Sequence, residues 1–66
     1  MYKVLYSGGY VKRNYKHTFD SLGAAVRYFA ENLKKSDKQE IHSVTCGSRY
    51  VNVRKFRRCV LIEARK

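Results

Sequence analysis

Five cations stand within ten residues in the segment 49–58, and the segment contains no acidic residue. Two aromatic residues, Tyr50 and Phe56, are interleaved with these cations. Aromatic rings stack on unpaired bases, neighbouring cations neutralise phosphates, and the planar guanidinium of Arg matches phosphate geometry. The segment therefore predicts a surface that binds a polyanion. We expect its principal contacts to be Arg49, Tyr50, Arg54, Lys55, Arg57 and Arg58.

A second basic cluster lies in the N-terminal part of the chain, where Tyr10 and Tyr15 are interleaved with cations. We expect this cluster to supply secondary contacts through Lys12, Arg13 and Lys16. Strand order decides whether the two clusters share one surface, and the sequence leaves that order open. A different interpretation of the segment 49–58 is a solvated strand whose charges only prevent edge-to-edge pairing.

The net charge supports the binding interpretation. Fifteen Lys and Arg oppose five Asp and Glu in a chain of 66 residues, which gives a formal charge of +10. Solubility of a small domain needs a charge of only about 2–8, and a larger excess costs stability through self-repulsion. A partner of opposite charge is the usual reason for such an excess. We expect nucleic acid, DNA or RNA, or a nucleoprotein complex, held by salt-sensitive backbone contacts.

Catalysis is the less favoured interpretation. A basic chain of this size can be a small ribonuclease toxin, with His17 or His42 as the general base, but neither histidine sits in a recognisable catalytic motif. Cys46 and Cys59 stand thirteen residues apart without a C-x-x-C pair, which favours reduced, packed thiols over the alternative of a metal site with His17 or His42. We therefore expect a protein that is not an enzyme and has no cofactor, metal or small-molecule substrate.

The length predicts a single small domain, because about 66 residues can bury only one modest core. The 44% hydrophobic and 14% aromatic content argues against disorder. No apolar run approaches the roughly 18 residues of a membrane span, and the N-terminus lacks the apolar core of a secretory signal. We expect a cytoplasmic protein with no membrane partner.

The elements that position these residues begin with a helix over residues 20–35. Apolar side chains recur there with the helical period of 3.6 residues, and Asp20, or alternatively Ser21, is placed to cap the first turn. Phe19 precedes the cap and is placed to pack on the helix as a hydrophobic staple. The apolar stripe consists of Leu22, Val26, Phe29, Ala30 and Leu33.

Strands are expected on both sides of this helix. Residues 2–6 and 10–18 predict a hairpin, residues 40–46 a third strand, and residues 50–56 and 59–64 a fourth and a fifth. Gly47 and Ser48 predict a turn between the third and fourth strands. The order β-β-α-β-β-β predicts an α+β fold, with one amphipathic helix packed on a mainly antiparallel sheet of four or five strands. The expected apolar partners of the helix are Val51, Val53, Val60 and Ile62.

The helix start at residues 19–26, Phe-Asp-Ser-Leu-Gly-Ala-Ala-Val, resembles that of small bacteriophage proteins that disable host machinery. The predicted order of elements resembles some type I CRISPR inhibitors, and its first part resembles a phage inhibitor of bacterial RNA polymerase. The resemblance implies an inhibitor without a cofactor that acts in the host cytoplasm by covering a surface. The chain is basic, so it does not imitate DNA. The alternative to a nucleic-acid contact is an acidic surface of a host protein such as RNA polymerase.

Overall fold

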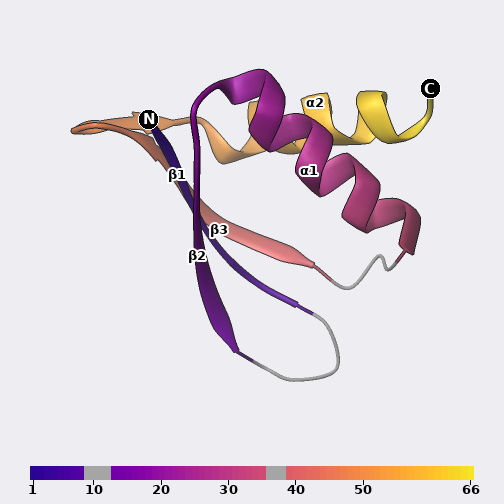
Figure 1. The fold of residues 1–66 in the computed structure, drawn as a ribbon, viewed down its shortest axis with the longest axis horizontal. Coiled ribbons are helices and arrows are strands. Elements are labelled where there is room, and N and C mark those ends of the chain that lie inside the picture. The colour runs from indigo at the N-terminus through magenta and orange to yellow at the C-terminus, as the bar shows by residue number, and fades with distance from the viewer. Residues whose placement is uncertain (9–12, 36–38) are drawn as a thin grey trace.

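The computed structural model describes residues 1–8, 13–35 and 39–66. Within these ranges the chain forms β1 (Tyr2–Ser7), β2 (Asn14–Phe19), α1 (Leu22–Lys35), β3 (Glu40–Cys46), β4 (Arg49–Val51) and α2 (Val53–Ala64) (Figure 1). The predicted α+β class is confirmed, and the first five elements follow the predicted order. The sixth element is a helix where a strand was expected.

The four strands form one sheet in the order β2-β1-β3-β4, and every neighbouring pair is antiparallel. Side chains alternate between its faces, so Val4 and Tyr6 of β1 are buried while Lys3 and Leu5 are exposed on the other side. Both helices lie on the face that carries Val4 and Tyr6 (Figure 1). One face of the sheet therefore builds the core, and no described helix covers the other.

The hairpin between β3 and β4 turns at the predicted glycine. Gly47 has a φ of 61°, a left-handed conformation that glycine adopts without steric cost. A glycine with positive φ at the first loop position suits a two-residue hairpin, and Cys46 pairs directly with Arg49 across the turn.

Helix α1 follows its predicted pattern closely. Phe29 and Ala30 are buried and the other three members of the predicted stripe pack against the core. The backbone N–H of Ala24 donates to Oγ of Ser21 at 3.1 Å, so Ser21, and not Asp20, caps the helix. Phe19 lies two residues before this cap, so it is not at the staple position; it is buried against Tyr28 and Phe29 of α1.

The prediction for the C-terminal third was wrong. Strand β4 ends at Val51, and residues 53–64, which include the expected fifth strand, form helix α2. The fold therefore has two helices and no fifth strand among the described residues. Ile62 was expected in the core but is 55% exposed. Both cysteines are free, but Cys59 is exposed, so the expectation of a packed thiol fails for this residue.

The physical reason is the spacing of the inward-facing residues. Phe56 and Val60 lie four residues apart and are buried, which is the repeat of a helix and not of a strand. Asn52 caps the helix, because its Oδ1 accepts hydrogen bonds from the backbone N–H groups of Arg54 (2.9 Å) and Lys55 (3.2 Å). The alternation of apolar and polar residues over 50–56 resembles a strand, so both the helical spacing and the Asn52 cap were missed in the sequence.

The core joins the sheet and both helices around a pair of aromatic rings. Phe29 of α1 and Phe56 of α2 meet edge to face, with ring centroids 5.9 Å apart and an interplanar angle of 78°. Their exposed fractions are 1% and 2%, and Val4 and Val44 of the central strands complete the fully buried group. Helix α2 is thus an integral part of the core.

Replacing Asn52 with Ala tests this cap. We expect Asn52→Ala to lower the free energy of unfolding by about 1 kcal/mol, because two backbone N–H groups lose their acceptor. Chemical denaturation followed by circular dichroism measures the change. Asn52→Asp is the control, since it keeps an acceptor and adds a charge that the helix N-terminus favours. Equal stability of Asn52→Ala and the wild type would contradict the capping role.

Candidate nucleic-acid interface

The outward face of α2 gathers the basic residues that the C-terminal sequence supplies. Helical geometry places Arg54, Arg58, Leu61 and Arg65 on one line at i, i+4, i+7 and i+11, opposite the buried Phe56. Lys55 lies beside this line, and all four cations are exposed. We call the set of Arg54, Lys55, Arg58 and Arg65 the basic stripe of α2.

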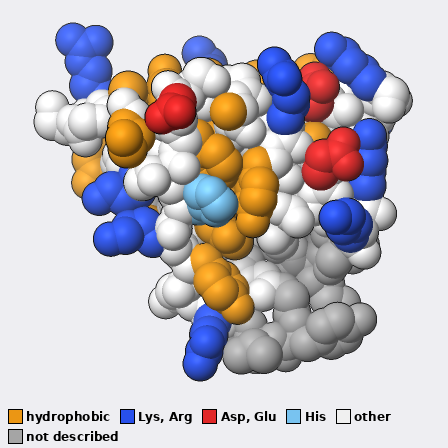
Figure 2. Space-filling model, in the orientation of Figure 1, with side chains coloured by type: hydrophobic (Ala, Val, Ile, Leu, Met, Phe, Trp, Pro, Cys, Tyr) orange, Lys and Arg blue, Asp and Glu red, His pale blue; other side chains and the backbone are white. Residues whose placement is uncertain are grey.

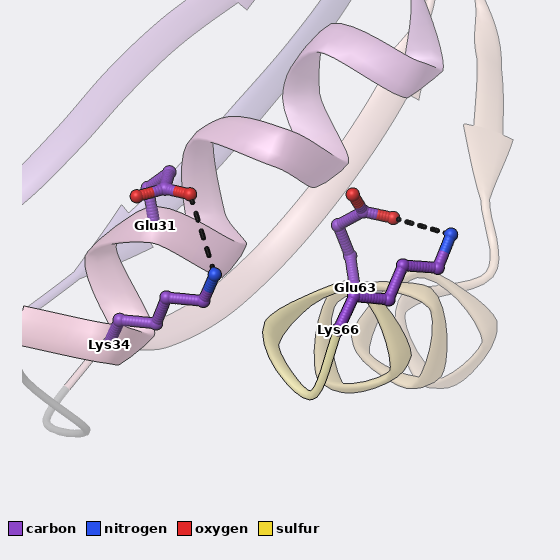
Figure 3. A network of polar contacts seen from close by, with 4 residues as sticks. All are labelled: Glu31, Lys34, Glu63 and Lys66. Atoms are coloured by element: carbon purple, nitrogen blue, oxygen red, sulfur yellow. Dashed lines mark ion pairs between the residues drawn. The ribbon is translucent and has the colours of Figure 1, made fainter.

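The basic stripe has no carboxylate to neutralise it among the described residues. The ion pairs among the described residues are Glu31 with Lys34 (3.6 Å) and Glu63 with Lys66 (3.4 Å), each between residues three apart in the chain (Figure 3). Glu63 is the only acid of α2, and it lies off the stripe, on the half-buried side of the helix. The stripe is therefore left open to an external anion.

The position of two of these cations opposes the stability of the helix. Arg54 and Lys55 stand in the first turn of α2, which contains no acidic residue. The N-terminal end of a helix carries the positive end of the helix dipole and favours anions over cations. Such an arrangement is unfavourable in the free protein and becomes favourable when an anion covers the stripe.

The other residues predicted as contacts in the segment 49–58 do not lie on the basic stripe. Arg57 is exposed on the flank of α2 that faces α1. Arg49 and Tyr50 lie in β4, where alternation directs them to opposite faces of the sheet. Tyr50 is 83% exposed on the face away from the helices. Phe56 is in the core, so it does not join Tyr50 as an exposed stacking ring.

The second cluster does not join the basic stripe. Lys16 is exposed in β2 and pairs with Leu5, so it projects from the face of the sheet opposite the helices. Arg13 is exposed just before β2. Lys12 lies outside the described residues. Lys16 thus shares the helix-free face of the sheet with Tyr50 of the first predicted cluster, whereas the basic stripe lies on α2.

Sequence reasoning missed Arg65, Leu61 and Lys3. Arg65 continues the line of Arg54 and Arg58. The spacing of these three arginines places them on one helix face, so it would have indicated the site if the segment had been predicted as a helix. Leu61 is 50% exposed on the same line. Lys3 lies on the helix-free face of the sheet, between Thr18 and Thr45 in the strand register.

Aromatic side chains fill the space between β2 and α1. The imidazole of His17 stacks on Phe19, with ring centroids 4.4 Å apart, and lies 4.7 Å from Tyr28. Tyr6 stacks on Tyr15 at 5.5 Å. In Figure 2, hydrophobic side chains and a histidine gather in the middle of this view, and Lys and Arg lie around the margin. On this face the described cations therefore lie apart from the hydrophobic cluster.

The two histidines occupy separate environments. His17 faces the helices, while Nε2 of His42 lies 2.8 Å from Oγ of Ser7, a side chain that projects from the opposite face. They cannot act together as acid and base on one phosphate. In the described part of the chain, no three His, Cys, Asp or Glu side chains come together as metal ligands, and neither helix is long and apolar enough to cross a membrane.

Comparisons with known proteins found no similar protein. No family model matches the chain, and neither a curated protein nor a solved structure is similar enough to count as a match. The resemblance to phage inhibitors stays a prediction.

The aromatic cluster makes stability depend on alkaline pH. Burial, together with the contacts with Tyr28 and Tyr15, raises the pKa of Tyr6 from 10.0 to about 12. The folded protein thus favours the neutral phenol. The stabilisation that comes from keeping the Tyr6 phenol neutral is fully present below pH 10.0 and is lost as the pH rises toward about 12.

We expect the free energy of unfolding of the wild type to fall more steeply over this pH range than that of Tyr6→Phe, which has no phenol to ionise. Urea denaturation at several alkaline pH values measures both curves. Tyr50→Phe is the control, because Tyr50 is 83% exposed and should leave the pH dependence unchanged. Parallel curves for the wild type and Tyr6→Phe would show that Tyr6 does not cause the dependence.

Proposed function

We propose that the protein is a non-enzymatic nucleic-acid-binding protein that holds the phosphate backbone with the basic stripe of α2. The observation that carries this proposal is the stripe itself: four exposed cations on one helix face, without an acidic partner among the described residues. Arginine supplies three of the four, and its planar fork pairs with two phosphate oxygens at once.

The geometry favours contacts to the backbone over stacking on bases. Leu61 is the non-basic member of the line, and the exposed aromatic residue of the C-terminal segment, Tyr50, projects from another surface. From Arg54 to Arg65 the helix rises by roughly 16 Å at 1.5 Å per residue, so the cations can follow several consecutive phosphates. We propose DNA or RNA, alone or within a nucleoprotein complex of the cytoplasm, as the partner.

The role implied by the resemblance to phage inhibitors fits this proposal. A protein that covers the nucleic acid of a host complex, such as a CRISPR effector, would block its use by occupancy. The proposal needs no cofactor and no catalytic residue, since binding alone produces the effect.

A salt titration tests the proposal. We expect binding to labelled single- and double-stranded DNA and RNA to weaken steeply from about 50 to 200 mM salt, because each neutralised phosphate releases counterions. With four contacts the slope of log K against log salt should be roughly −3 to −4. Arg54→Ala with Arg58→Ala should reduce the size of the slope by about 2 on duplex DNA.

The matched control removes the same charge from another surface. Arg27 and Lys35 are exposed on α1, so Arg27→Ala with Lys35→Ala should leave most of the slope intact. Equal losses in the two double variants would indicate attraction by net charge alone. Absence of binding to all four nucleic acids at low salt would overturn the proposal.

A further inference from the structure

A hollow of about 170 Å³ lies where α1, α2 and the start of β3 meet. Its walls are mostly apolar and come from Phe29, Leu33, Ile41, Val60 and Leu61. Two polar side chains, Gln39 and Arg57, also line it. We call this hollow the interhelical pocket. It lies on the flank of α2 and shares no cation with the basic stripe.

The volume limits what the interhelical pocket can hold. Sites for cofactors and drug-sized molecules measure about 300–1,000 Å³, well above this volume. An engineered apolar cavity of about 150 Å³ is large enough for one benzene molecule. A single apolar side chain, of the size of Leu or Phe, is therefore the group that fits.

The two polar groups indicate how that side chain would be presented. The Oε1 atom of Gln39 is buried and has no hydrogen-bond partner among the described residues. A buried acceptor without a donor costs free energy, and a backbone N–H next to the inserted side chain would satisfy it. Arg57 is exposed at the pocket and forms no ion pair with a described carboxylate, so it can bind an acidic residue of the same segment.

We propose that the interhelical pocket binds one Leu or Phe side chain of an acidic protein segment. The segment's carboxylates pair with Arg57, and its backbone donates to Gln39. A nucleobase fits less well, because five apolar walls would leave most of its polar edge without partners. A second copy of this chain also fits less well, because two molecules of charge +10 repel.

This inference goes beyond the proposed function. The basic stripe contacts nucleic acid, whereas the pocket contacts a protein, and the two surfaces lie side by side on α2. Together they suit a nucleoprotein target in which an acidic protein segment lies near the nucleic acid.

A peptide titration followed by methyl NMR tests the proposal. The probe is acetyl-Glu-Glu-Leu-Glu-Glu-amide, and the control peptide carries Ser in place of Leu at identical charge. We expect the Leu peptide to shift the methyl signals of Ile41, Val60 and Leu61, and to bind about tenfold more tightly than the Ser peptide. A Phe peptide should behave like the Leu peptide.

Variants of the pocket separate the insertion of a side chain from attraction by charge. Leu33→Phe fills the pocket from within and should abolish the difference between the Leu and Ser peptides. Leu61→Ser, at a position that is 50% exposed, should reduce the same difference in a variant whose folding is not at risk. Arg57→Gln should weaken the acidic Leu peptide more than Arg27→Gln, which removes a charge of α1 outside the pocket.

Three outcomes would overturn the proposal. Equal affinity for the Leu and Ser peptides would mean that only charge attracts them. A shift confined to Leu61, with Ile41 and Val60 unchanged, would place the peptide on the outward face of α2 and not in the pocket. Shifts of Ile41 and Val60 caused by raising the protein concentration without peptide would identify a second copy as the occupant.

Discussion

Phe29 and Phe56 meet edge to face at 5.9 Å, at the point where both helices reach the sheet. The two side chains are 1% and 2% exposed, so neither helix can turn about its axis without opening the core. Because Phe56 points inward, helical geometry directs Arg54 and Arg58 outward and leaves Arg57 beside α1. One aromatic contact thus determines the orientation of the basic stripe and the shape of the interhelical pocket.

Different surfaces of the molecule carry different types of side chain. The helix-free face of the sheet carries short polar side chains with Lys3, Lys16 and Tyr50, whereas α2 presents a row of cations. The aromatic residues serve mainly in packing, as the stack of His17 on Phe19 illustrates. A separation of this kind favours contacts to phosphate and carboxylate over stacking on bases. Tyr50 is the exception among the aromatic residues, because its side chain is 83% exposed.

Sequence patterns predicted α1, the first three strands and the Gly47 turn, because each has a strong and unambiguous period or turn residue. Helix α2 was not predicted, and the reason is physical. Val51 and Val53 flank Asn52 and imitate the alternation of a strand, although Asn52 ends β4 and caps α2. The sequence named most of the basic residues of the candidate site, but their grouping on one face could be seen only once α2 was known to be a helix. Phe56 had been expected to be exposed, and tertiary packing decided that it is buried.

The crowding of four like charges on one short helix gives dissolved salt two opposite effects on this molecule. Ions in solution screen the repulsion among Arg54, Lys55 and Arg58, and so favour the folded state of α2. Under the proposed function, the same ions would compete with the bound polyanion and release it. The salt concentrations that stabilise the free protein most would then be those at which the proposed complex is weakest, and a dilute buffer that favours the complex would leave the unbound chain least stable.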